Sequence, residues 1–83
     1  MRVLYFTAKW CGPCKAMKPI IEKFMETNPG VINKIDVDED LDAILEYKIS
    51  SIPTFVVFNA EGDEVNRHSG ALNEASLNQL VFG

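Results

Sequence analysis

The chain has 83 residues, of which 47% are hydrophobic, and a formal net charge of −4 at pH 7. This length allows one modest hydrophobic core, so we expect a single domain over residues 1–83. The negative charge argues against general nucleic-acid binding. A membrane-spanning helix needs about 20 apolar residues, and no apolar run of the chain approaches that length. Met1-Arg2 leads directly into a strand-like run, and the chain has only two cysteines, so we expect a cytoplasmic protein.

Strand and helix signals alternate along the first half of the chain. Val3–Thr7 is almost continuously apolar, which predicts a central strand covered on both faces. Apolar residues then recur at helical spacing from near Pro13 until Asn28-Pro29-Gly30. Within this helix Pro19 is expected to produce a kink, because proline lacks the N–H that the helix needs. Val31–Val37 is predicted to form a second strand.

The second half begins with a short helix after Val37, followed by a hairpin and a last helix. Three apolar residues of the short helix are expected to face inward: Leu41, Ile44 and Leu45. The hairpin consists of Thr54–Phe58, a turn at Gly62 and the returning strand Asp63–Ser69, and the last helix begins at the N-cap Asn73. The order β-α-β-α-β-β-α predicts an α/β protein with a mixed four-stranded sheet flanked by helices.

Both cysteines lie in the segment Trp10-Cys11-Gly12-Pro13-Cys14, between the first strand and the first helix. Two thiols at this spacing can close a small ring and reopen it by exchange with another disulfide. A cysteine at a helix N-terminus faces unpaired backbone N–H groups, which favour its thiolate. We therefore predict a reversible dithiol, with Cys11 as the more exposed nucleophile and Cys14 as the half-buried resolving cysteine.

The same cysteine spacing also fits half of a zinc site or a structural staple. Zinc needs about four ligands, and outside the pair the chain offers only His68 and scattered carboxylates. We therefore expect no metal site and a solvated or hydrogen-bonded His68. A staple is also disfavoured, because closing so short a loop contributes only about 2 kcal/mol.

These motifs together resemble the thioredoxin family over nearly the whole chain, from about Val3 to the C-terminus. The resemblance lies in the segments Trp10-Cys11-Gly12-Pro13-Cys14-Lys15, Pro19, Ile52-Pro53-Thr54 and Gly70-Ala71-Leu72. A Cys-Gly-Pro-Cys centre after a Trp is typical of the thioredoxin branch, whereas glutaredoxins usually have Cys-Pro-Tyr-Cys. The resemblance implies a thioredoxin fold with strand order 2-1-3-4, whose last two strands run antiparallel to the first two.

The resemblance implies a protein-disulfide reductase that works through Cys11 and Cys14 and needs no bound cofactor. It also implies a monomer that acts in electron transport and cell redox homeostasis, with disulfide-containing proteins as substrates and thioredoxin reductase or another electron donor. A glutaredoxin-like enzyme that uses glutathione is an alternative, favoured by the short chain and disfavoured by Gly12-Pro13. A thioredoxin-fold binding subunit with incidental redox activity is another alternative.

The resemblance further implies a substrate-binding surface around the cysteines. We expect Trp10 to be a partly exposed flap over the dithiol, with Gly12 and Pro13 supporting the pair. We also expect a cis Ile52-Pro53 bond that packs against both cysteines and leaves neighbouring backbone to pair with an extended substrate. The expected substrate-contacting residues are Trp10, Ser51, Ile52, Pro53, Gly70 and Ala71.

The chain departs from the family pattern in two ways. Thioredoxins usually have an extra strand and helix before the central strand, so we expect Val31–Val37 to be a sheet edge and the fold to be marginally stable. Thioredoxins also usually bury an Asp at the position of Tyr5, near a Lys that matches Lys34. A phenol stays protonated at neutral pH and cannot replace that base. Tyr5 is therefore expected to be a core aromatic, or to hydrogen-bond toward Lys34 or a water.

Overall fold

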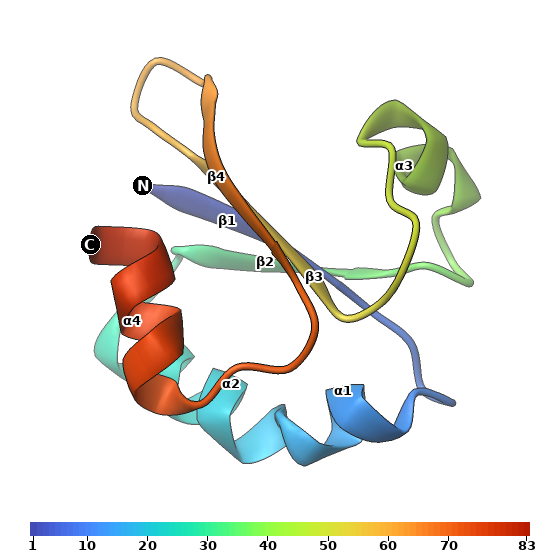
Figure 1. Cartoon of the computed structure of the whole chain (residues 1–83), viewed down its shortest axis with the longest axis horizontal. Helices are drawn as coiled ribbons and strands as arrows, with labels where there is room; N and C mark the ends of the chain where they lie inside the picture. The colour runs from blue at the N-terminus through green and yellow to red at the C-terminus, as the bar shows by residue number, and fades with distance from the viewer.

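The computed structural model describes all 83 residues, which fold around one four-stranded sheet (Figure 1). The strands are β1 (Arg2–Thr7), β2 (Ile32–Asp36), β3 (Thr54–Phe58) and β4 (Glu64–Ser69). Their order in the sheet is β2-β1-β3-β4, with β1 parallel to β2 and antiparallel to β3, and with β3 antiparallel to β4. The predicted mixed sheet and its strand order are confirmed.

Helices cover both faces of this sheet. They are α1 (Gly12–Ala16), α2 (Lys18–Thr27), α3 (Leu41–Glu46) and α4 (Glu74–Phe82). Helices α2 and α4 lie on one face, and α3 lies on the other (Figure 1). None of the four has both the length and the apolar character that a membrane-spanning helix requires.

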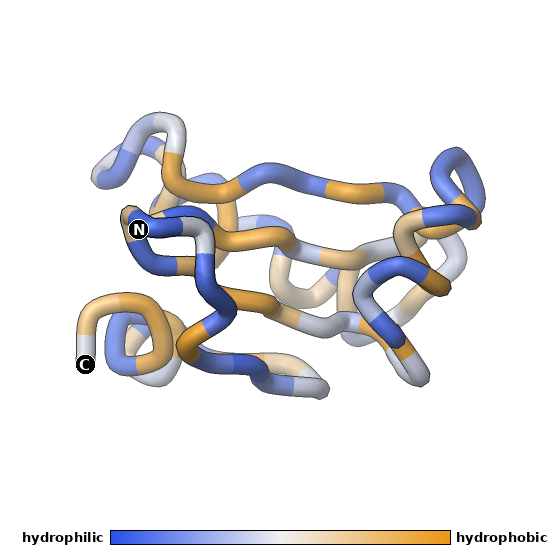
Figure 2. The backbone as a smooth tube through the Cα atoms, turned by 90° about the horizontal axis from the view of Figure 1, so that it is seen from above, coloured by the Kyte–Doolittle hydropathy of each residue, from blue (hydrophilic) through white to orange (hydrophobic).

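Side-chain alternation in the central strands β1 and β3 divides the core into two layers. Val3, Tyr5 and Val57 pack against α2 and α4, whereas Leu4 and Val56 belong to the layer that contains both cysteines and the buried part of α3. Figure 2 shows the hydrophobic residues along the central strands and hydrophilic stretches in the outer loops. The central strands are buried on both faces, as their continuous apolar runs predict.

Local signals at the ends of the elements are confirmed. Asn73 is the N-cap of α4, and its side chain accepts a hydrogen bond from Ser76 N–H at 2.8 Å. Gly62 occupies the hairpin turn with φ +87°, a conformation that favours glycine because a Cβ would be strained there. These features depend on residues close together in the chain, and the sequence predicts them well.

The region around Pro19 differs from the prediction of one kinked helix. Two separate helices, α1 and α2, meet at Met17. The Met17 N–H donates to the carbonyls of Pro13 and Cys14 at 3.2 Å each, so the chain turns without losing this donor. Pro19 lies in the first turn of α2, where its missing N–H leaves no intrahelical bond unmade.

The predicted inward face of α3 is confirmed for Ile44 and wrong for Leu41 and Leu45. Leu41 and Leu45 are 66% and 79% exposed, while Ala43 is buried and Ile44 is partly buried. Because successive residues are about 100° apart around a helix, the face that contains Ala43 and Ile44 continues into Tyr47 and turns Leu41 and Leu45 toward solvent. Tyr47 packs against the same cluster, and this packing determines which side of α3 faces inward.

Candidate active site

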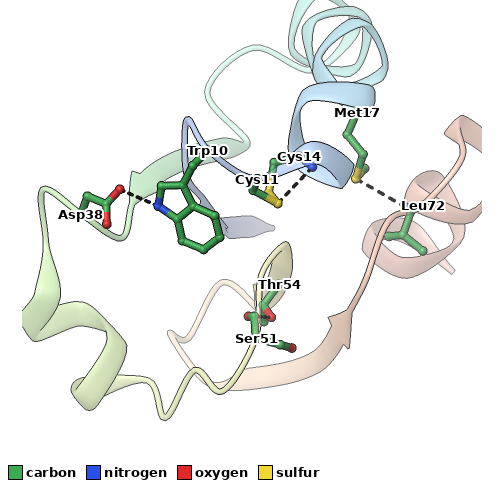
Figure 3. The surroundings of a disulfide bond; sticks show 8 residues. All are labelled: Trp10, Cys11, Cys14, Met17, Asp38, Ser51, Thr54 and Leu72. Atoms are coloured by element: carbon green, nitrogen blue, oxygen red, sulfur yellow. Dashed lines mark hydrogen bonds between the residues drawn. A yellow bond between two sulfur atoms is a disulfide. The ribbon is translucent and has the colours of Figure 1, made fainter.

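Cys11 and Cys14 form a disulfide at the start of α1, with their Cα atoms 5.2 Å apart. Cys11 is the N-cap of this helix, and its Sγ accepts a hydrogen bond from the Cys14 N–H at 3.2 Å (Figure 3). A backbone N–H directed at sulfur stabilises negative charge there after reduction. Only Cys11 Sγ receives such a bond, so the two sulfurs are chemically unequal.

The predicted difference in exposure between the two cysteines is wrong for this disulfide. Each cysteine is 5% exposed, and both pack against the cluster that contains Leu4, Phe6 and Val56. The distinction between the cysteines rests on the hydrogen bond to Cys11 rather than on burial. Gly12 and Pro13 span the ring between them, with Pro13 in the first turn of α1, as the helix start requires.

Trp10 lies on the surface next to the disulfide, with 65% of the residue exposed. Its Nε1 donates a hydrogen bond to Asp38 Oδ2 at 2.8 Å, and Figure 3 shows the indole beside Cys11. Asp38 is in turn positioned by its own N–H, which donates to Asp36 Oδ1 at 2.9 Å. The expected exposure of Trp10 is confirmed, and its side chain is held in place by Asp38, which follows β2.

The loop before β3 faces the disulfide, and Figure 3 shows Ser51 and Thr54 opposite Cys11. The Ile52-Pro53 bond is cis, as predicted, Pro53 is fully buried, and Ile52 packs against the cluster that contains both cysteines. The Thr54 hydroxyl donates to the Ser51 carbonyl at 2.6 Å. These contacts fix the loop, whereas the N–H and C=O of Ile52 have no hydrogen-bond partner within the chain.

The segment after β4 joins this loop. Gly70 N–H donates to the Pro53 carbonyl at 2.8 Å, and Leu72 N–H donates to Met17 Sδ at 3.5 Å (Figure 3). Gly70 has φ +109°, so the close approach to Pro53 uses a conformation suited to glycine. Trp10 and the Ser51–Pro53 loop thus lie at the disulfide, and Gly70 is joined to that loop.

On another side of the site, Tyr5 lies under α1 and α2 as a core aromatic. It is 3% exposed, and its ring stacks on Phe55 with centroids 4.8 Å apart. Lys34 is its register partner on β2, but no hydrogen bond joins the two side chains. Both residues instead line a cleft of about 550 Å³ that also reaches Cys14.

Three residues of the site were not predicted from the sequence. Asp38 is 28 positions from its partner Trp10, and Met17 is 55 positions from Leu72. Asp36 reaches the cleft because β2 runs parallel to β1 and places it opposite Thr7. No local pattern indicates these pairings. His68 lies on β4 opposite Phe55, away from the disulfide, and no group of three or more potential metal ligands is present.

Comparisons with known proteins agree with this geometry. The family model "Thioredoxin" matches residues 1–82. Thioredoxin-2 of Saccharomyces cerevisiae is 42% identical over 80 residues, which cover 95% of this chain and 75% of that protein. A thioredoxin H-type of Fagopyrum esculentum is 39% identical, over 95% of this chain and 68% of its own length. The crystal structure of reduced Schistosoma mansoni thioredoxin pre-protein superposes with a TM-score of 0.84 at 33% identity, covering 95% and 73% of the two chains.

Proposed function

Because the chain belongs to the thioredoxin family and is a protein-disulfide reductase, we propose different roles for its two cysteines. Cys11 attacks the substrate disulfide, and Cys14 resolves the mixed disulfide that forms. The observation that supports this assignment is the hydrogen bond from the Cys14 N–H to Cys11 Sγ. Because this bond stabilises the thiolate of Cys11, and no equivalent bond reaches Cys14, Cys11 is the sulfur prepared for attack.

The reaction consists of two exchange steps. The Cys11 thiolate attacks one sulfur of the target disulfide, and the other target sulfur leaves as a thiolate. Cys14 then loses its proton and attacks Cys11 Sγ, which closes the Cys11–Cys14 disulfide and releases the reduced target. Cys14 is held one helical turn from Cys11, so the second step is intramolecular and has a high effective concentration.

An extended segment of the target is proposed to bind across the disulfide. The unpaired N–H and C=O of Ile52 offer one site for backbone hydrogen bonds, in the manner of an added strand. Trp10 supplies an exposed aromatic surface beside the disulfide, and Gly70 is hydrogen-bonded to Pro53 in the loop that faces it, with Ala71 next in the chain. These elements determine where a substrate is held, while the cysteines carry out the exchange.

We propose thioredoxin reductase as the electron donor and the cytoplasm as the setting, with residues 1–83 acting as one monomeric domain without a bound cofactor. Membership of the thioredoxin family supports the donor, and the use of both cysteines in one motif, which leaves none for a structural disulfide, supports the cytoplasm. In this role the protein transfers electrons to protein disulfides and contributes to cell redox homeostasis. A reductase-plus-NADPH assay, run beside a glutathione-plus-glutathione-reductase assay, distinguishes this donor from the glutaredoxin-like alternative. A binding subunit with incidental redox activity would show slow turnover in both assays.

Two cysteine variants test the assignment of roles. Cys11→Ser should abolish reduction of insulin disulfides, whereas Cys14→Ser should accumulate a mixed disulfide through Cys11, because the resolving thiol is missing. Alkylation of the reduced protein at mildly acidic pH, followed by peptide mapping, should label Cys11 first. Preferential labelling of Cys14 would show that the roles are reversed.

A further inference from the structure

The segment that joins β4 to α4 is held by hydrogen bonds at only two points. Gly70 N–H donates to the Pro53 carbonyl at 2.8 Å, and Leu72 N–H donates to Met17 Sδ at 3.5 Å (Figure 3). These are the only hydrogen bonds that the backbone of residues 70–72 forms within the chain. Ala71 lies between the two points and is exposed, and its N–H and C=O have no partner. The position of this free backbone therefore depends on one anchor at Pro53 and one at Met17.

Met17 is fixed to the helix that carries the cysteines. It caps the end of α1, and its N–H donates to the carbonyls of Pro13 and Cys14 at 3.2 Å each. Its side chain is 1% exposed and packs in the core layer that contains Tyr5 and Phe55. Backbone and side chain are thus both held, so the sulfur is a firm point of attachment. Through this sulfur the position of Leu72 is set relative to α1.

The thioether sulfur does something here that an aliphatic side chain of the same size cannot do. Sulfur is a weak hydrogen-bond acceptor, whereas leucine and isoleucine have no acceptor at all. Leu72 is partly buried and packs against the same core layer, and its N–H has no other acceptor within the chain. Without the sulfur this donor would lack a partner, which favours a shift of the segment toward water.

On the basis of the proposed function, we propose that Met17 is a positioning residue for protein substrates, because its sulfur holds the backbone of Ala71 in place for an extended target chain. A target that pairs with the free N–H and C=O of Ile52 then has a second backbone site at Ala71. Met17 takes no part in the exchange itself, since its side chain lies in the core layer that does not contain the cysteines. Its effect is on binding, and it depends on the target having a peptide backbone.

The test compares a protein disulfide with a small one in the variant Met17→Leu, which keeps the apolar volume and removes the acceptor. Reduction of insulin at saturating dithiothreitol gives kcat and KM for the protein substrate. Met17→Leu should raise this KM by about two- to tenfold and leave kcat unchanged, as expected for the loss of one neutral hydrogen bond. Reduction of bis(2-hydroxyethyl) disulfide, which has no peptide backbone, should proceed at the wild-type rate. A general loss of packing would instead slow both reactions.

Matched controls separate the sulfur from the packing of the side chain. Met25 packs against the same core layer and its sulfur forms no hydrogen bond, so Met25→Leu should keep the wild-type KM. Norleucine or selenomethionine can also replace all three methionines. Norleucine has the length of methionine without its sulfur and should reproduce the effect of Met17→Leu. Selenium keeps the acceptor, so the selenomethionine protein should behave like the wild type.

Amide hydrogen exchange measured by NMR reports the hydrogen bond directly. The Leu72 N–H should exchange severalfold faster in Met17→Leu than in the wild type, and at the wild-type rate in Met25→Leu. The proposal is overturned by unchanged exchange of Leu72 or by an unchanged KM for insulin in Met17→Leu. Equal losses with insulin and the small disulfide, or equal KM values for the norleucine and selenomethionine proteins, would also overturn it.

The wild-type protein in the same insulin assay separates this proposal from the proposed function. Normal wild-type turnover together with an unchanged KM in Met17→Leu would contradict the role of Met17 alone. If the wild-type protein does not turn over insulin with dithiothreitol, the proposed function itself is wrong.

Discussion

At the scale of single residues, Tyr5 distinguishes this site from the usual family pattern. Its ring is buried against Phe55, and it shares a cleft with Cys14, Lys34 and Asp36. A carboxylate at this position would line the same cleft as Cys14 and would add a proton acceptor there. Tyr5 provides no carboxylate, so the proton of Cys14 is expected to leave through the cleft to solvent.

Tyr5→Asp should speed the second exchange step severalfold near neutral pH, because it adds a base beside Cys14. It should also lower the free energy of unfolding by about 2–4 kcal/mol, since it removes aromatic packing and buries a carboxylate. Stopped-flow decay of the mixed disulfide between about pH 6 and 9 measures the first effect, and urea unfolding measures the second. Tyr5→Phe keeps the ring and should decay like the wild type. Identical decay of Tyr5→Asp and the wild type at every pH would refute the proton-acceptor argument.

At the scale of the elements, α3 is attached to the sheet by fewer residues than its sequence indicates. Only Ala43 is buried, with Ile44 and Tyr47 packed beside it, while Leu41 and Leu45 face solvent. Its N-terminus is capped by Asp40, whose side chain accepts a hydrogen bond from Ala43 N–H at 3.1 Å. The helix therefore depends on its cap and on one narrow packed face.

Leu45→Lys should change the free energy of unfolding by less than about 0.5 kcal/mol, because the side chain is already exposed. Ala43→Leu should cost about 1–3 kcal/mol, because it forces extra methylene groups into a filled contact. Urea unfolding of the two variants provides the measurement. If Leu45→Lys costs as much as Ala43→Leu, the observed orientation of α3 is incorrect.

A second link at this scale joins β4 to the end of α3. Arg67 donates two hydrogen bonds to the Glu64 carboxylate, at 2.9 and 2.8 Å, and another to the Tyr47 carbonyl at 2.8 Å. The hydrogen bonds from Arg67 hold the pKa of the Glu64 carboxyl below its ordinary value. Because the pKa is lower in the folded protein than in the unfolded chain, the ionised Glu64 carboxylate stabilises the fold at pH values above its ordinary pKa. This stabilisation is lost as the pH falls through the lowered pKa.

Glu64→Gln should therefore cost a few tenths of a kcal/mol at pH 7, a small effect because both side chains are partly exposed and screened by solvent. The difference from the wild type should shrink as the pH falls below about 4. Arg67→Gln should cost more, about 1 kcal/mol, because it also removes the hydrogen bond to Tyr47. Urea unfolding at several pH values tests both variants, and a Glu64→Gln effect that grows toward acid pH would contradict the assigned direction.

At the scale of the whole molecule, a small core is divided between the two faces of one sheet. Twenty of the 83 residues are buried, and β3 contributes Phe55, Val56 and Val57, each with 0% exposure. Because these adjacent residues alternate in direction, β3 takes part in both core layers. Loss of packing in this strand should therefore affect the whole fold.

Phe55→Ala should lower the free energy of unfolding by about 3–5 kcal/mol. This is a large part of the whole free energy of unfolding of a typical domain, which is about 5–15 kcal/mol. Phe82→Ala should cost about 1 kcal/mol or less, because Phe82 is 55% exposed and mainly contacts Phe24. Circular dichroism during urea unfolding compares the variants. Similar costs for both would show that β3 is less central than its burial indicates.

The sequence by itself determined the features that depend on neighbouring residues. The dithiol spacing, the Asn73 cap, the turn at Gly62 and the apolar runs of the central strands follow from local spacing and backbone preference. The strand order was inferred from the family resemblance, because local periodicity does not specify which strands pair.

Tertiary structure alone decided the features that depend on distant parts of the chain. It turned Leu41 and Leu45 outward, because Tyr47 packs the opposite side of α3, and it brought Trp10 to Asp38 through the parallel pairing of β1 with β2. It also gathered lysines from β2, α1 and α2 around a cleft at Cys14. The physical reason is the same in each case: the energy of such contacts depends on where packed elements place side chains in space, and the residues involved share no local pattern along the chain.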